Sequence, residues 1–264
     1  MAHRKKLIVG NWKMNFNIRE ASIFVHKLAE SVAVHRDVEI VLAPTYLALQ
    51  PVSLQIDRRQ FKLASQNLYS KDSGAFTGEV SATQLRGLVD YAIIGHSERR
   101  HIFHEHDKDI RDKVQAAIRN DIKPILCIGE TAHERAENET RDVLTDQLTG
   151  GLANVTSEDL AHVVIAYEPV WAISNGANFA HHKTPIPEEI TKVVQIIRRH
   201  ISHQYGDEAS RGISILYGGS VSPDNAAAYL DTEGVDGLLI GGASIKQQAF
   251  TTIVDLAHKR VGEK

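Results

Sequence analysis

The segment Val163-Val164-Ile165-Ala166-Tyr167 is a short apolar run that stops at a carboxylate, Glu168, and then at Pro169. Apolar runs of this length, rich in β-branched residues, are typical of strands buried on both faces, as in a parallel sheet covered by helices. Proline fixes φ and lacks an N–H donor, so the strand ends here and Glu168 stands where it emerges. The residues from Trp171 to Gly176 have the composition of a loop that closes over a site, although an ordinary strand-to-helix connection is the alternative.

The same alternation of a short apolar run and an amphipathic helical pattern recurs along the chain. Eight strand-like segments are found, at Leu7–Gly10, Glu39–Ala43, Phe61–Ser65, Tyr91–Gly95, Lys123–Cys127, Val163–Tyr167, Ile213–Tyr217 and Gly237–Ile240. Helical stripes lie between them, such as the apolar positions from Ile18 to Val32, where Asn17 and Glu20 predict a capping box. Eight strands alternating with helices predict parallel βα units. The closed (β/α)8 barrel is the simplest arrangement, and an open doubly wound sheet is the alternative.

The composition is that of an ordinary globular protein of 264 residues, 42% hydrophobic and 24% charged. A net charge of -3 gives no general attraction to nucleic acid or acidic membranes, and no apolar run is long enough to span a bilayer. No signal peptide is visible, and the single cysteine, Cys127, excludes an internal disulfide and fits a cytoplasmic location. Because no linker or charge block divides the chain, we expect one domain over residues 1–264.

Barrel enzymes gather their functional residues at the C-terminal ends of the strands. Those ends carry Asn11 and Lys13, Gln66-Asn67, His96-Ser97-Glu98, Gly129-Glu130, Glu168, Gly218-Gly219-Ser220 and Gly241-Gly242. In an extended segment the side chains of Asn11 and Lys13 would share a face, being two residues apart. The barrel therefore predicts a carboxylate, an imidazole, an ammonium and two glycine turns on one face.

These groups fit proton abstraction next to a carbonyl in a small phosphorylated substrate. Glycine turns after the seventh and eighth strands let backbone N–H groups converge on a phosphate. Glu168 would take the proton, His96 would polarise the carbonyl oxygen, and Lys13 would stabilise the developing negative charge. This chemistry requires neither a metal nor an organic cofactor.

Each of these residues also has a structural interpretation. A hydrogen-bonded core histidine would account for His96, and a solvated strand end for Lys13. Cys127 lies within an apolar strand and is expected to pack rather than react. Glu98 and Glu130 could be buried structural carboxylates or catalytic groups. A metal site is not expected at His101, His104 and His106 or at His181-His182, because their spacing lacks a helical His pair and no cysteine supports them.

Six motifs resemble the triosephosphate isomerase family, in the family's order and over nearly the whole chain. They are Gly10-Asn11-Trp12-Lys13-Met14-Asn15, Gly95-His96-Ser97-Glu98-Arg99-Arg100, Cys127-Ile128-Gly129-Glu130, Ala166-Tyr167-Glu168-Pro169-Val170-Trp171-Ala172-Ile173, Tyr217-Gly218-Gly219-Ser220 and Gly241-Gly242-Ala243-Ser244. The resemblance implies a single-domain α/β protein with the (β/α)8 TIM barrel fold. It further implies interconversion of dihydroxyacetone phosphate and D-glyceraldehyde 3-phosphate through an enediol(ate), in glycolysis and gluconeogenesis.

The resemblance also implies a role for individual residues. Glu168 becomes the catalytic base, His96 the electrophile, and Asn11 and Lys13 bind substrate and stabilise charge. The family's histidine acts as a neutral imidazole beside its glutamate base, a pairing that is a standard example of this chemistry. The substrate phosphate would be held by the backbone of Ser174, Ser220, Gly241 and Gly242, with Leu239 lining the pocket.

The family is usually a homodimer, and the segment Gln66–Glu79 resembles its protruding interface loop. One departure concerns the loop after Ile173, where the family typically has Gly-Thr-Gly-Lys and this chain has Ser174-Asn175-Gly176-Ala177. The following residues, Asn178 to Lys183, look like an insertion. We expect altered closing kinetics, since losing the first glycine removes backbone freedom. An isomerase for a related sugar phosphate, such as a four-carbon ketose phosphate, and an inactive phosphate-binding dimer are the alternative functions.

Overall fold

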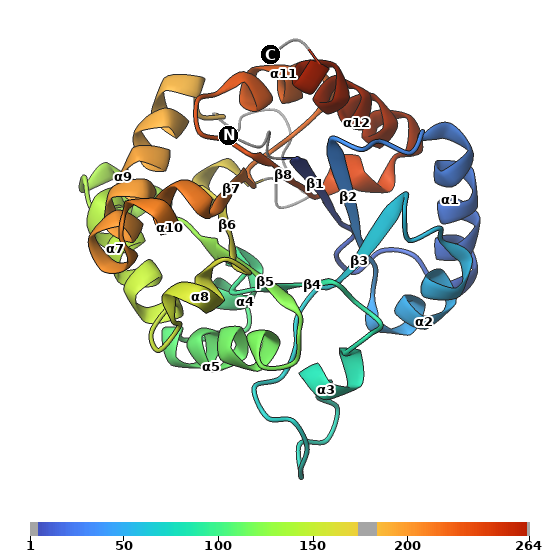
Figure 1. The fold of residues 1–264 in the computed structure, drawn as a ribbon, viewed down its shortest axis with the longest axis horizontal. Coiled ribbons are helices and arrows are strands. Elements are labelled where there is room, and N and C mark those ends of the chain that lie inside the picture. Colours follow the sequence, from blue (N-terminus) through green and yellow to red (C-terminus); the bar gives the residue numbers. More distant parts are fainter. Residues whose placement is uncertain (1–4, 174–183, 263–264) are drawn as a thin grey trace.

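The computed structural model describes residues 5–173 and 184–262. Eight parallel strands follow one another in chain order and close into a barrel, because the first strand pairs with both the second and the last (Figure 1). This closure confirms the predicted (β/α)8 barrel and rules out the open sheet. The strands are β1 (Lys6–Asn11), β2 (Val38–Ala43), β3 (Phe61–Ser65), β4 (Tyr91–Ile94), β5 (Lys123–Ile128), β6 (Val164–Tyr167), β7 (Ser214–Tyr217) and β8 (Gly237–Ile240).

Helices form a ring outside the strands (Figure 1). They are α1 (Ile18–Ser31), α2 (Tyr46–Gln55), α3 (Ala82–Leu85), α4 (Ser97–His101), α5 (Asp107–Ile118), α6 (Ala132–Ala136), α7 (Thr140–Gly151), α8 (Ser157–Leu160), α9 (Pro187–Tyr205), α10 (Asp207–Gly212), α11 (Pro223–Asp231) and α12 (Gln247–Gly262). Two short 3-10 turns, η1 (Val170–Ala172) and η2 (Gly242–Ile245), follow β6 and β8. No helix in the described ranges is long and apolar enough to cross a membrane.

The first helix begins as its sequence predicts, although its buried face differs. Asn17 accepts a hydrogen bond from the Glu20 N–H (3.0 Å), and the Glu20 carboxylate accepts one from the Asn17 N–H (2.9 Å). Ile18 was expected on the buried face, but it is 47% exposed, whereas Phe24 is buried. Ile18 lies in the first turn, at the edge of the face that Phe24 and its neighbours present to the barrel.

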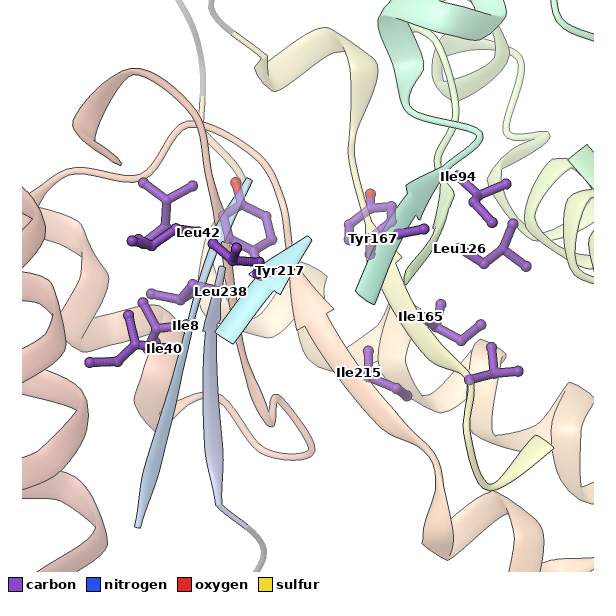
Figure 2. Packing of buried hydrophobic residues seen from close by; sticks show 14 of the residues in the cluster. Ile8, Ile40, Leu42, Ile94, Leu126, Ile165, Tyr167, Ile215, Tyr217 and Leu238 are labelled. Carbon is purple, nitrogen blue, oxygen red and sulfur yellow. The ribbon is translucent and has the colours of Figure 1, made fainter. Parts of the chain in front are cut away.

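Strand side chains alternate between the barrel interior and the layer beneath the helices. The outer set, which includes Ile8, Ile40 and Leu126, packs against the helices (Figure 2). A separate inner set fills the barrel and includes Val9, Val41 and Cys127. Burial raises the pKa of the Cys127 thiol well above its ordinary value, so this cysteine packs and carries little thiolate.

Candidate active site

The C-terminal ends of the strands surround one pocket of about 960 Å³, large enough for a small organic phosphate. Its walls include the described residues predicted to be catalytic or substrate-binding, namely Asn11, Lys13, His96, Glu168, Ser220, Leu239, Gly241 and Gly242, whereas Gln66-Asn67, Ser97 and Gly129-Glu130 do not line it. The predicted residues that line it come from β1, β4, β6, β7 and β8 or from the turns that follow them. Ser174 to Lys183, the loop whose sequence differs from the family pattern, lies outside the described residues.

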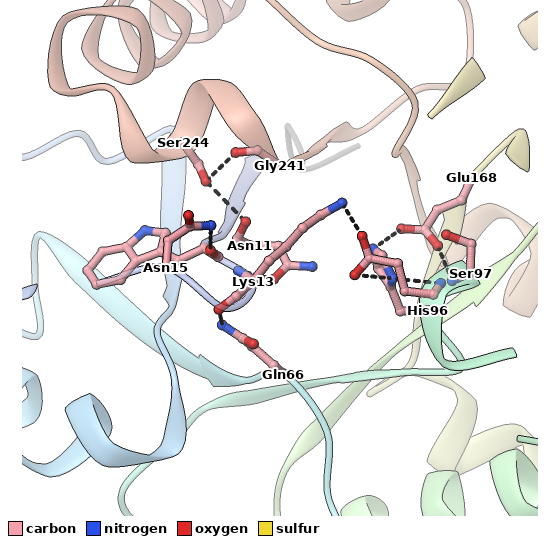
Figure 3. A network of polar contacts seen from close by, with 11 residues as sticks. Asn11, Lys13, Asn15, Gln66, His96, Ser97, Glu168, Gly241 and Ser244 are labelled. Carbon is pink, nitrogen blue, oxygen red and sulfur yellow. Dashed lines mark hydrogen bonds and ion pairs between the residues drawn. The ribbon is translucent and has the colours of Figure 1, made fainter. Parts of the chain in front are cut away.

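Lys13 reaches the pocket by a route that differs from the sequence-based expectation. The segment is not extended there, because β1 ends at Asn11 and Lys13 has a left-handed φ of 53°. One local and one long-range hydrogen bond hold this turn. The Lys13 N–H donates to Oδ1 of Asn11 (3.0 Å), and the Gln66 amide donates to the Lys13 carbonyl (2.8 Å). The side chains of Asn11 and Lys13 therefore share the pocket because of this turn, shown in Figure 3, and not because of the alternation of side chains along a strand.

The Lys13 ammonium makes an ion pair with Glu98, a residue that the sequence left between two roles. Its Nζ lies 2.6 Å from Oε1 of Glu98, and both side chains are partly exposed to the pocket. Figure 3 shows the lysine extended across the pocket toward the segment that carries His96. Glu98 thus belongs to the site and directs the cation toward the reacting end of the pocket.

His96 is buried, and its hydrogen bonds assign its tautomer. It caps α4, and its Nδ1 accepts a hydrogen bond from the Glu98 N–H (3.2 Å). The Glu98 carboxylate is 3.7 Å from the same nitrogen, beyond hydrogen-bond distance. A nitrogen that accepts a backbone N–H carries no proton, so the ring proton is on Nε2. His96 therefore points a neutral N–H donor at the pocket.

Glu168 directly follows β6 and is only 2% exposed. Its Oε1 lies 3.1 Å from Nε2 of His96, and its Oε2 accepts a hydrogen bond from the Ser97 N–H (3.0 Å) (Figure 3). Burial next to these two donors holds the carboxylate in a single position beside the imidazole. In this resting state both oxygens are occupied, so substrate must displace at least one donor before the carboxylate can accept a carbon-bound proton.

Glu130 has a structural role, whereas the sequence alone could not decide between a structural and a catalytic role for Glu98 and Glu130. It is fully buried and receives hydrogen bonds from the Tyr167 hydroxyl (3.1 Å) and from Nε1 of Trp171 (2.9 Å). Arg135 adds an ion pair at 3.5 Å and stacks over the Trp171 ring. Glu130 thus anchors η1, the turn that begins directly after the catalytic strand, to the body of the barrel.

Two close backbone approaches explain why glycine stands beside Glu168. A Cβ on Gly129 would lie 1.9 Å from the Glu168 carbonyl oxygen, and one on Gly218 would lie 2.8 Å from Cγ of Glu168. Gly129 is fixed in place by Gln147, whose amide exchanges hydrogen bonds with its backbone. The absence of a Cβ at these two glycines provides the space that Glu168 occupies.

The opposite end of the pocket is open and lined by backbone and hydroxyl groups. A Cβ on Gly242 would meet no atom within 4 Å, so the space above this residue is free. The Ser220 hydroxyl has no hydrogen-bond partner among the described residues. Ser244 fixes the turn, because its hydroxyl donates to the Gly241 carbonyl (2.7 Å). This corner suits an anion that approaches glycine N–H groups at the start of a helical turn.

Arg100 supports the site from behind, and the sequence analysis did not assign it a role. Its guanidinium donates to the carbonyl oxygens of Gly95 (2.8 Å) and Cys127 (3.0 Å) and pairs with Asp107 (2.7 Å). It therefore ties together the ends of β4 and β5. Its position within the Gly95–Arg100 motif was the sequence signal that could have identified Arg100.

The histidines considered for a metal do not gather in the part of the chain that the structure describes. His101, His104 and His106 form no group of ligand atoms, and His181-His182 lie outside the described residues. A different group, at the other end of the barrel, is described below.

A barrel with a buried glutamate, a neutral histidine donor, a paired lysine and an anion-binding corner defines an isomerase-type site for a small phosphorylated carbonyl compound. The comparisons with known proteins are specific. The family model for triosephosphate isomerase matches residues 6–257, and the chain belongs to this family. The chain is 42% identical to the triosephosphate isomerase of Alkaliphilus metalliredigens over 253 residues, which cover 96% of this chain and 99% of that protein.

Two further relatives carry the same name. The triosephosphate isomerase of Endomicrobium trichonymphae is 41% identical over 252 residues, covering 95% of this chain and 98% of its own length. That of Chloroherpeton thalassium is 40% identical over 257 residues, covering 97% and 100% respectively. The chain therefore spans the full length of its relatives.

Proposed function

We propose that this protein interconverts dihydroxyacetone phosphate and D-glyceraldehyde 3-phosphate, the triose phosphate isomerisation of glycolysis and gluconeogenesis. The family membership supports the reaction. The observation that carries the assignment of residues is the 3.1 Å contact between the Glu168 carboxylate and the His96 Nε2, at the wall of the pocket.

In this mechanism Glu168 removes a proton from the carbon next to the carbonyl, and the electron pair moves onto the carbonyl oxygen. The Nε2–H of His96 donates to that oxygen, and the Lys13 ammonium and the Asn11 amide stabilise its negative charge. The proton then returns to the neighbouring carbon, while the hydroxyl proton of the first carbon moves to the former carbonyl oxygen through His96, so the isomerisation balances without a cofactor. Because Glu168 is only 2% exposed, its carboxylate has little contact with water and the abstracted proton stays available for return.

The substrate phosphate is assigned to the open corner of the pocket. Ser220, Gly241 and Gly242 line it, and Ser174 is assigned to it from the family resemblance. Leu239 lines the wall between this corner and the reacting end, where it is 2% exposed. An apolar wall there excludes water from the enediolate without competing for its charge.

The chain is further proposed to act as a homodimer through the loop Gln66–Glu79. This loop extends away from the barrel in Figure 1. Large hydrophobic side chains stay exposed in this part of the surface, namely Phe76 (39%) in this loop, Met14 (96%) in the loop after β1 and Leu47 (78%) in the first turn of α2. Exposed apolar residues at neighbouring loops are typical of a surface that a partner covers. A second copy would place its own loop next to Asn11 and Lys13.

Residues 1–264 are proposed to work as one catalytic domain in the cytoplasm. The barrel needs its first and last strands to pair, which supports one folding unit. A lone buried cysteine and a role in glycolysis support a cytoplasmic setting.

A coupled assay on D-glyceraldehyde 3-phosphate tests the reaction, with Glu168→Gln as the matched control. Glutamine keeps the shape of the side chain but cannot accept the proton, so kcat should fall by at least about a thousandfold. Equal rates for the two proteins would refute the proposed role of Glu168. A wild type that is inactive on triose phosphate but isomerises a four-carbon ketose phosphate would instead refute the substrate assignment.

A further inference from the structure

A cluster of two histidines and one aspartate lies at the other end of the barrel from the active site. His35 and Asp37 belong to the connection between α1 and β2, and His258 is in α12. Asp37 immediately precedes β2, so the cluster is at the N-terminal ends of the strands, whereas the catalytic pocket is at their C-terminal ends. In Figure 1 the two helices concerned, α1 and α12, are neighbours in the outer ring.

The three side chains converge. The His258 Nδ1 lies 2.9 Å from Oδ2 and 3.0 Å from Oδ1 of Asp37. The rings of His35 and His258 are in contact, with a centroid separation of 4.1 Å. One ligand atom from each residue can be chosen so that all three lie within 4.8 Å of one another.

One buried nitrogen of this cluster lacks a hydrogen bond to the described residues. Nε2 of His35 is buried and has no hydrogen-bond partner among the described residues. Buried polar atoms in folded proteins are nearly always paired, because an unpaired one forfeits its hydration. An ion bound through this nitrogen would give it a partner that the described residues do not supply.

We propose that His35, Asp37 and His258 bind a divalent transition-metal ion of the zinc type. Two imidazole nitrogens and one carboxylate oxygen are ligands that Zn²⁺ accepts, whereas Mg²⁺ and Ca²⁺ prefer oxygen ligands throughout. Three protein ligands leave the fourth position of a tetrahedral ion to water.

The ligand side chains must move closer together to bind an ion. With bonds of about 2.0–2.1 Å, ligand atoms of a tetrahedral site stand about 3.3 Å apart. The side chains of His258 and Asp37 are partly exposed, with 48% and 26% of their surface accessible, so they have room to turn. The two stacked rings must rotate until a nitrogen of each faces the ion.

The bound ion would connect the last helix to the start of the second strand. Asp37 is held by the barrel itself, since its carbonyl accepts a hydrogen bond from the Lys6 N–H (2.9 Å). Helix α12 already touches α1 through the hydroxyls of Ser31 and Thr251, which are 3.2 Å apart. The ion would strengthen this join without contacting any residue of the pocket.

Isothermal titration of the metal-free full chain with Zn²⁺ tests the proposal. We expect one strong site per chain, and His35→Ala and His258→Ala should each weaken its affinity by about tenfold or more. His162→Ala removes an exposed histidine elsewhere and should leave the affinity unchanged. The titration is repeated in a His181→Ala/His182→Ala background, so that those two histidines do not contribute. Unchanged zinc affinity in His35→Ala would overturn the proposal.

Two further readouts separate metal binding from a loss of folding. Isomerase activity should be the same in wild type and His35→Ala, because the cluster lies at the far end of the barrel. Saturating Zn²⁺ should raise the Tm of the wild type by about 5 °C and that of His35→Ala by much less. Equal zinc-induced shifts in the two proteins would show that the ion binds elsewhere.

Discussion

The ammonium of Lys13 lies 2.6 Å from a carboxylate oxygen of Glu98, so this pocket cation is paired before substrate arrives. This pairing holds a long flexible side chain in the direction of the reacting end. Side-chain freedom that is lost beforehand does not have to be lost in the transition state. Glu98 thus acts on the reaction through the position of the lysine.

Glu98→Gln should therefore lower kcat/KM by about tenfold, since a hydrogen bond remains but the charge that directs Lys13 is gone. Lys13→Met should cost much more, on the order of a hundredfold or beyond, because the charge itself is removed from the transition state. Steady-state kinetics on both variants measures the difference. If the two losses were the same size, Glu98 would have a direct role beyond holding Lys13.

Trp171→Phe tests the anchoring of η1 by Glu130. The substitution keeps an aromatic ring for Arg135 but removes the Nε1 hydrogen bond to a fully buried carboxylate. We expect a loss of about 1.5–3 kcal/mol in the free energy of unfolding, the usual value for a hydrogen bond to a charged group. We also expect a lower kcat, because η1 begins only two residues after Glu168. Urea denaturation and kinetics measure the two effects, and a fully stable variant would show that Glu130 is satisfied without Trp171.

Gly129→Ala should destabilise the protein because its Cβ would lie 1.9 Å from the Glu168 carbonyl oxygen. The neighbouring atom is backbone, so relief requires movement of the catalytic strand and a cost of about 3 kcal/mol. Gly212→Ala is the matched control, because a Cβ there meets no atom within 4 Å. Thermal unfolding should show a clear fall in Tm for the first variant and none for the second. A normal Tm and a normal kcat in Gly129→Ala would contradict this account of the close approach.

Gly242→Asp tests the phosphate corner. The carboxylate would occupy the free space above Gly242 and repel an anion there, so binding of a phosphorylated enediolate mimic should weaken by at least about tenfold. Gly242→Ala adds a methyl group to the same open space without charge and should bind the mimic nearly as well as the wild type. Calorimetry gives both affinities. Equal weakening by the two substitutions would point to backbone conformation instead of charge.

The fold could be predicted from the sequence because each barrel strand is buried on both faces and so appears as an apolar run. All eight predicted strands are present, with ends that differ by at most about one residue. The order of the strands then decides which residues share the pocket. For this reason residues as distant in sequence as Asn11, Glu168 and Gly242 could be grouped without a structure.

Other features depend on tertiary contacts that no local pattern carries. The left-handed φ of Lys13 is held by Gln66, from a different βα unit, and local preference would not place lysine there. Glu98 and Glu130 are the same residue type after neighbouring strands, yet one faces Lys13 and the other is enclosed by Tyr167 and Trp171. Their roles are determined by partners more than 35 residues away in sequence, which is why sequence reasoning could not separate them.

The contact of Ser244 with Asn11 links the first strand to the turn after the last. The Ser244 hydroxyl lies 3.3 Å from the Asn11 carbonyl oxygen, across 233 positions of the chain. The substrate-binding amide and the anion-binding turn are therefore assembled only when the ring closes. A chain still emerging from the ribosome holds Lys13, His96 and Glu168 but has no enzyme activity until β8 pairs with β1. During refolding, isomerase activity should therefore appear no earlier than ring closure, the longest-range event that this topology requires.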